Sequence, residues 1–258
     1  MSTLKRTLEL GLWGFGAATP LWALFVVMYG ASSWWVSDGL GRVLGSVHGE
    51  PLGASGMSEL LIEGLVQMAL WGLFEPAFVI TGAVGVVVVA GREGMGLRLL
   101  SRALMALPVG VFLATLTVLV WQLIIPGLAC EVIGCYVVIS MVVAHDGQRV
   151  RSAFQPWIRH PIMSGGLLLA TGVANVLAAT LLPLALSGVD GTLNLFMGDA
   201  KALPTWSLVT MDVSGAIVCV LSSCLFAALL IHCDPPQDPS RNAVRPSRSA
   251  TRTAPQAL

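Results

Sequence analysis

Three carboxyl-bearing residues, Glu75, Glu131 and Asp212, lie inside long apolar segments of the sequence. A carboxyl group is costly in a membrane, so one that is kept there is a candidate for proton transfer or cation binding. Each falls within about two or three turns of the end of its predicted helix that faces away from the cytoplasm. No Lys or Arg is predicted at the same depth in the membrane to neutralise these carboxyls. Removal from water therefore favours their protonated, neutral form. The pattern predicts either a proton or cation path, or neutral carboxyls hydrogen-bonded to groups such as Gln122 and Ser214.

The remaining reactive side chains form no recognisable catalytic or metal-binding pattern. The pairs Cys130/Cys135 and Cys219/Cys224 are each five residues apart, which differs from the C-x-x-C spacing of redox and zinc sites. The sequence contains no G-x-S-x-G motif, no phosphate-binding P-loop and no dinucleotide-binding fingerprint. We therefore expect a protein without enzyme activity, metal or cofactor.

The composition indicates that the elements holding these carboxyls are membrane-spanning helices. Of 258 residues, 55% are hydrophobic and 11% are charged, whereas about a quarter are charged in an ordinary soluble domain. The net charge is zero, which gives no reason to expect a nucleic-acid partner. In lipid every backbone polar group must be satisfied within the protein, so helix is the default. We expect an all-α polytopic helix bundle.

Six apolar segments are long enough to cross a bilayer, which needs about 20 residues. The run from Ala103 to Ala144 is too long for one helix, and Pro126-Gly127 supplies a hairpin turn within it. The first run exceeds the usual apolar region of a signal peptide, so we expect an uncleaved helix. The predicted spans are residues 8–30, 65–90, 103–125, 127–144, 162–187 and 206–232, within a transmembrane domain of residues 1–233.

The distribution of basic residues predicts the orientation of these spans. Cytoplasmic loops carry an excess of Lys and Arg. Both termini are therefore predicted to be cytoplasmic, because that arrangement puts only Arg42 and Lys201 outside and the other twelve Lys and Arg residues inside. The twelve are Lys5, Arg6, Arg92, Arg98, Arg102, Arg149, Arg151, Arg159, Arg241, Arg245, Arg248 and Arg252.

Two cytoplasmic regions lie outside the predicted spans. The segment Gly147 to His160 is basic, with Val150, Phe154 and Trp157 at helical spacing. It is either an ordinary basic loop or a segment along the anionic leaflet, with lipid-headgroup contacts from Arg149, Arg151 and Arg159. Residues 234–258 have few apolar side chains, and we expect a disordered tail.

The middle of the chain resembles a known group of membrane proteins. A helix with a basic start is followed by the motif Leu123-Ile124-Ile125-Pro126-Gly127. The next helix is followed by Ala144-His145-Asp146-Gly147-Gln148-Arg149, which precedes another apolar span. This order, over about residues 95–175, is similar to bacterial six-span proteins grouped with the membrane domain of glycerophosphodiester phosphodiesterases. Those proteins often have an acidic residue where His145 stands. The resemblance implies a membrane bundle without a catalytic barrel.

Together these features predict a multi-pass protein of a bacterial cytoplasmic membrane. We expect a non-catalytic membrane or envelope accessory protein, whose partners are lipids and another membrane protein or a second copy of the chain. The alternative is a small permease or permease subunit in which Glu75, Glu131 and Asp212 form a proton- or cation-linked path. An aqueous path past Glu75 would distinguish the permease from the accessory protein.

Overall fold

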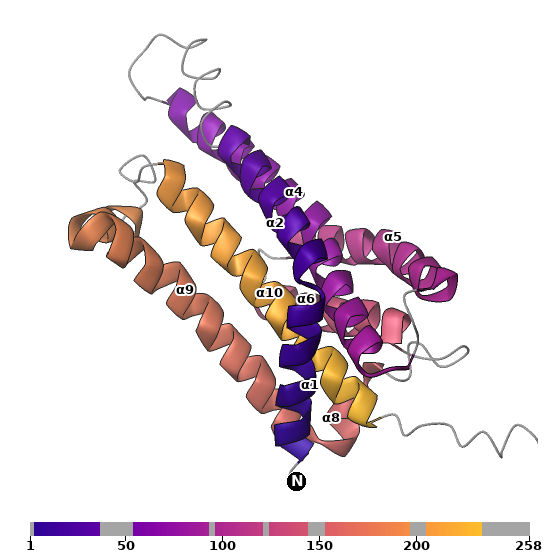
Figure 1. Cartoon of the computed structure of the whole chain (residues 1–258). Helices are drawn as coiled ribbons and strands as arrows, with labels where there is room; N and C mark the ends of the chain where they lie inside the picture. The colour runs from indigo at the N-terminus through magenta and orange to yellow at the C-terminus, as the bar shows by residue number, and fades with distance from the viewer. Residues whose placement is uncertain are drawn as a thin grey trace, which may run out of the picture.

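The computed structural model describes residues 3–36, 54–92, 96–120, 124–143, 153–196 and 205–233. These ranges form helices and contain no strand, so the prediction of an all-α protein is confirmed for them (Figure 1). Within these ranges four helices are long and apolar enough to cross a membrane, or five if one bent pair is counted as a single span. The predicted disordered tail, residues 234–258, lies outside the described residues.

The first predicted span is a bent pair of helices in the structure, not one helix over residues 8–30. Helix α1 comprises Thr3–Ala17 and α2 comprises Thr19–Trp34, and the two are bent by 66°. Pro20 causes the break because it has no backbone N–H and its ring clashes with the preceding turn. The hydroxyl of Thr19 and the indole N–H of Trp22 both donate to the carbonyl oxygen of Phe15, at 3.3 and 3.1 Å. These side chains satisfy a backbone acceptor at the bend.

The next three helices form the middle of the bundle. Helix α4 comprises Ala54–Val89, α5 comprises Leu97–Val120 and α6 comprises Ile124–Val143. The helices α5 and α6 pack against each other as the predicted hairpin. Pro126 and Gly127, however, lie in the first turn of α6 and not between the two helices. Proline is tolerated there, since the first N–H groups of a helix have no intrahelical partner in any case.

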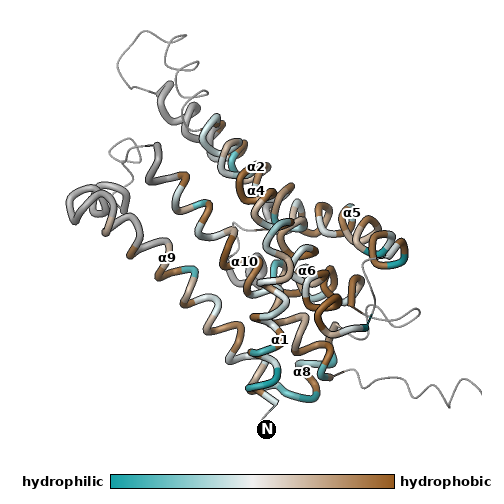
Figure 2. Tube along the Cα trace, in the orientation of Figure 1, coloured by the Kyte–Doolittle hydropathy of each residue, from teal (hydrophilic) through white to brown (hydrophobic). Residues whose placement is uncertain are grey.

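The last three helices begin with the short α8, Gln155–Arg159, followed by α9, Pro161–Phe196, and α10, Thr205–Cys233. Helix α10 packs against α1, α2, α4, α6, α8 and α9, so it is the centre of the bundle. Of the candidate spans, those in α4 and α10 are the most buried, whereas the span Pro161–Ala178 of α9 is the least buried. Figure 2 shows apolar residues along the helices, as expected for a bundle surrounded by lipid.

Glycines allow the buried helices to approach one another closely. A Cβ at Gly85 of α4 would collide with the carbonyl oxygen of Gly14 in α1. A Cβ at Gly82 would lie 2.8 Å from the carbonyl oxygen of Val220 in α10. Small residues at such crossings are the usual means of helix packing in membranes. Because Gly82 and Gly85 are three residues apart, the crossings hold α1 and α10 next to each other along one face of α4.

All the described Lys and Arg residues lie at one end of the bundle, here called the basic end. They are Lys5, Arg6, Arg92, Arg98, Arg102 and Arg159, at the starts of α1 and α5, at the end of α8 and just after α4. Two of them bind the end of α10: Arg92 donates to the carbonyl oxygen of Ile231 at 2.9 Å, and Arg159 to that of Cys233 at 2.5 Å. Positive groups at a helix C-terminus satisfy its free carbonyls and its dipole.

Candidate functional site

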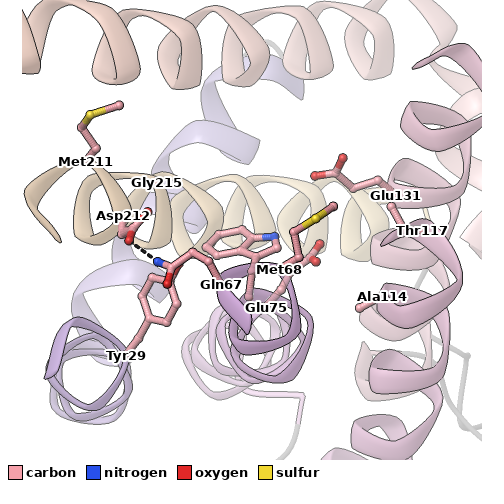
Figure 3. A pocket seen from close by; sticks show the side chains of 11 residues that line it. Tyr29, Gln67, Met68, Glu75, Ala114, Thr117, Glu131, Met211, Asp212 and Gly215 are labelled. Carbon is pink, nitrogen blue, oxygen red and sulfur yellow. Dashed lines mark hydrogen bonds between the residues drawn. The ribbon is translucent and has the colours of Figure 1, made fainter. Parts of the chain in front are cut away.

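A cavity of about 340 Å³ lies between α2, α4, α5, α6 and α10, and Glu75, Glu131 and Asp212 all line it. Figure 3 shows Asp212 and Gln67 at one side of this cavity and Glu131 at the other, with Glu75 and Met68 between them. We call it the carboxyl cavity. Its lining residues are Tyr29, Gln67, Met68, Trp71, Glu75, Ala114, Thr117, Glu131, Met211, Asp212 and Gly215.

Asp212 is held by a hydrogen-bond network that joins three helices. The hydroxyl of Ser33 in α2 and the side-chain N–H of Gln67 in α4 each donate to Asp212 Oδ2 at 2.5 Å. Gln67 Nε2 also lies 2.9 Å from the hydroxyl oxygen of Ser33. Both partners of Asp212 are neutral donors, which suits an ionised carboxylate because that group only accepts hydrogen bonds. The buried Gln67 Oε1 has no hydrogen-bond partner among the described residues.

Glu75 is the most deeply placed carboxyl, near the middle of the apolar span Gly64–Val89. Its residue surface is only 8% exposed. The thiol of Cys135 in α6 donates to Glu75 Oε1 at 3.6 Å, a weak hydrogen bond. Glu131 lies one turn earlier than Cys135 on α6, so that Glu75 and Glu131 border the same space. The indole of Trp71 is a second hydrogen-bond partner of Glu75, but burial beside another carboxyl disfavours the charged form of Glu75.

A second cavity of about 190 Å³ meets the first at this pair of glutamates. Trp71, Glu75 and Glu131 line both cavities. The second cavity extends from the pair toward the basic end between α6, α9 and α10, where it is lined by polar groups including Cys135, Asn175, Cys219, Ser222 and Ser223. We call it the inner cavity. The two cavities place polar groups along much of the bundle, with Glu75 and Glu131 at their junction.

Aromatic rings border the two cavities. Tyr29 of α2 lies 5.7 Å from Trp71 and 5.8 Å from Phe78, measured between ring centroids. Toward the basic end, the ring of Tyr136 packs 4.9 Å from Phe226 and 5.8 Å from Trp157 of α8. Tyr29 and Trp71 line the carboxyl cavity, and Tyr136 and Phe226 line the inner cavity.

The electrostatic character of both cavities is acidic. None of the residues that line the carboxyl cavity or the inner cavity is Lys, Arg or His. The described basic residues lie instead at the basic end, near the ends of the helices. A carboxylate in such a site needs a cation or a proton as its counter-charge, because an unpaired buried charge is strongly disfavoured. Within the described residues, no group of three or more His, Cys, Asp or Glu is placed to hold a metal ion.

The structure places each residue singled out from the sequence as follows. Glu75, Glu131 and Asp212 come together on one cavity, while their role as a proton or cation path stays a prediction. Ser214 donates to the carbonyl oxygen of Met211 at 2.7 Å and not to a carboxyl. Gln122, Arg149 and Arg151 lie outside the described residues, and Arg159 is exposed at the end of α8.

Among the lining and partner residues that sequence reasoning missed, the polar and aromatic ones are Tyr29, Ser33, Gln67, Trp71 and Thr117. A signal for two of them was present, because Gln67, Trp71 and Glu75 recur at every fourth position and therefore share one face of α4. Ser33 had no such signal, since its partner Asp212 is distant in sequence.

Comparison of the chain with protein-family models, with curated proteins and with solved structures finds no match. The resemblance of residues 95–175 to bacterial six-span proteins therefore stays a prediction. The site is interpreted from its own chemistry.

Proposed function

We propose that this protein is a small membrane permease, or a permease subunit, that binds an organic cation in the carboxyl cavity and exchanges it for protons. The observation that carries this proposal is that Glu75, Glu131 and Asp212, from three different helices, line one cavity. An accessory protein needs no such cavity. We therefore place the permease ahead of the accessory protein that we expected first from the sequence.

The chemistry of the lining favours an ammonium compound over a hydrated inorganic ion. The aromatic rings of Tyr29 and Trp71 can attract a cation through their faces, and Met68 and Met211 add polarizable apolar contacts. The volume of about 340 Å³ falls in the lower range of small-molecule sites. A compact alkylammonium ion with one positive charge matches both the acidic and the aromatic parts of this lining.

The different surroundings of the carboxyls support a division of roles. Asp212 has two neutral donors that favour its ionised form, so we assign it the fixed negative charge that attracts the cation. Glu75 is more deeply buried, with Cys135 and Trp71 as its hydrogen-bond partners, and lies near a second carboxyl, Glu131, so we assign this pair the exchangeable proton. Protons would leave through the inner cavity, which the same pair borders.

We also propose a bacterial cytoplasmic membrane as the location, with the basic end facing the cytoplasm. The six described Lys and Arg residues at that end support this orientation. In it, α1 begins in the cytoplasm and α10 ends there, which agrees with the predicted cytoplasmic termini. The carboxyl cavity then lies toward the outer half of the bundle and the inner cavity toward the cytoplasm.

Isothermal titration calorimetry of the purified full chain with tetraethylammonium chloride tests the proposed binding site. We expect saturable binding in the wild-type protein and at least tenfold weaker binding in Asp212→Asn. Glu9→Gln is the matched control, because it makes the same change of charge at an exposed residue paired with Lys5 at the basic end. Equal binding by the two variants, or no binding by the wild-type protein, would reject the proposed site.

The accessory protein remains a second candidate because of helix α9. Its span Pro161–Ala178 is the least buried of the candidate spans, and it exposes Ile162, Leu169, Val173 and Val176. An apolar face of this kind contacts lipid or another membrane protein. Co-purification of a stoichiometric membrane-protein partner, lost when Val173 and Val176 are both replaced by Phe, would favour this candidate.

A further inference from the structure

A groove of about 650 Å³ lies between the start of α1 and the start of α9, at the basic end of the bundle. Both helices pack against α10. The groove is separate from the carboxyl cavity, with which it shares no lining residue. It is lined by Leu4, Leu8, Arg159, His160, Pro161, Ile162, Met163, Gly166, Leu167 and Ala170.

The polarity of this groove changes along its length. Among its lining residues, Arg159 and His160 alone are basic or titratable, and both lie at one end. Helices α1 and α9 also begin at that end, and helix N-termini favour negative charge. Arg159 donates through Nη1 to the carbonyl oxygen of Cys233, which leaves further N–H donors on a five-donor guanidinium. This end of the groove is therefore suited to an anion.

The rest of the groove is apolar and open to the surroundings. From Ile162 to Ala170 the helix is about 12 Å long. This length is close to the hydrocarbon thickness of one leaflet, which is half of the core of about 30 Å. Ile162 is 91% exposed, and Leu4 and Leu8 of α1 are exposed on the other wall. Gly166 has no heavy atom within 4 Å of the position of a Cβ, so the floor of the groove is open there.

We propose that this groove binds one anionic phospholipid. Its phosphate would lie at Arg159 and His160, and an acyl chain would lie between Leu4 and Leu8 on α1 and Gly166 and Ala170 on α9. A lipid fits better than a protein helix because the charge complementarity is confined to one end, whereas the remaining lining is apolar over the length of one leaflet. The proposal does not depend on the proposed permease function.

The role of the Arg159 charge in lipid binding is tested with two lipids that have the same acyl chains but different headgroups. Delipidated full-length protein in detergent receives phosphatidylglycerol or phosphatidylcholine, and native mass spectrometry measures the bound fraction. We expect preference for phosphatidylglycerol, and about fivefold weaker binding in Arg159→Gln, the effect of one cationic contact near a membrane surface. Arg98→Gln, at another exposed arginine of the basic end, should bind as the wild-type protein does. Equal binding of the two lipids, or equal loss in both variants, would overturn the proposal.

The shape of the groove is tested independently by filling it. Gly166→Leu places a side chain in the open floor, and we expect it to abolish retention of phosphatidylglycerol. Gly165→Leu is the matched control, because a Cβ at Gly165 also meets no heavy atom within 4 Å but this residue does not line the groove. Retention by Gly166→Leu equal to that of Gly165→Leu contradicts the proposal. A wild-type dimer that Gly166→Leu dissociates would assign the groove to a second copy of the chain instead.

Discussion

Glu75 and Asp212 border the same cavity from α4 and α10, yet their hydrogen-bond partners differ in kind. Asp212 accepts from a hydroxyl and an amide, whereas Glu75 accepts a weak bond from the thiol of Cys135 at 3.6 Å and a bond from the indole of Trp71, and it lies near a second carboxyl, Glu131. Burial opposes the charged form of both carboxyls; the two donors to Asp212 offset part of this effect, whereas the neighbouring Glu131 further opposes the charged form of Glu75. The two groups therefore hold their protons with different strength, and this difference is the basis of the proposed exchange of a cation for protons.

The first prediction concerns the pH dependence of cation binding. Protonated Glu75 and Glu131 cannot attract a cation, so affinity for tetraethylammonium should rise as pH is raised and fall as pH is lowered. Glu75→Gln removes one titrating group and should flatten this dependence. Calorimetric titrations between pH 5 and pH 9, about the range in which proteins are handled, measure both curves. A wild-type affinity that does not change with pH would contradict the assigned role of the glutamate pair.

The second prediction concerns the aromatic wall of the carboxyl cavity. Replacing Trp71 by Leu removes an aromatic ring and the indole that bonds Glu75, which should weaken tetraethylammonium binding by about threefold or more, the effect of a loss near 1 kcal/mol. Trp13→Leu is the control, since Trp13 is 71% exposed on α1 and does not line the cavity. If both variants bind tetraethylammonium as the wild-type protein does, Trp71 makes no contact with the cation.

The third prediction concerns the crossing of α1 and α4. Gly85→Ala would place a methyl group against the carbonyl oxygen of Gly14, so the helices must separate. We expect a loss of about 1–3 kcal/mol in the free energy of unfolding, typical of an overpacked core. Gly16→Ala in α1 meets no heavy atom within 4 Å and should be neutral or slightly stabilising. Thermal unfolding in detergent compares the two, and equal melting temperatures would refute the close crossing.

The fourth prediction concerns the network around Asp212. Gln67→Leu removes the amide that bonds both Asp212 and Ser33, so the carboxylate loses a donor and its ionised form becomes less favourable. Cation affinity at neutral pH should fall about fivefold or more, in line with a hydrogen bond to a charged group. Raising the pH should restore part of the affinity by ionising Asp212 again. A loss that is the same at every pH would point to a purely structural role for Gln67.

The sequence contained enough information for the helical class and for the three carboxyl residues of the candidate site, but not for their partners. The apolar composition predicted helices, and three carboxyl residues stood out because charge is rare within the apolar segments. In the structure these three residues, Glu75, Glu131 and Asp212, line one cavity. The bend at Pro20 was readable in principle from the chemistry of proline. The position of the break before α6 was harder, because a proline in the first turn of a helix is as compatible with the sequence as a proline in a turn.

The pairing of helices could not be read from the sequence. The bond between Ser33 and Asp212 and the thiol contact between Cys135 and Glu75 depend on which helices lie side by side. In lipid, apolar faces are nearly equivalent, so packing follows small residues and polar contacts instead of an amphipathic stripe. The groove between α1 and α9 likewise results from the way both helices pack against α10.

In the proposed exchange, a cation that enters the carboxyl cavity displaces a proton from Glu75 or Glu131. Proton release can be measured directly with a pH-sensitive dye when tetraethylammonium is added to the purified full chain in weakly buffered detergent solution. We predict release of protons that saturates together with cation binding in the wild-type protein and is reduced in the Glu75→Gln variant. Cation binding without proton release, or release that is unchanged in that variant, would contradict the account.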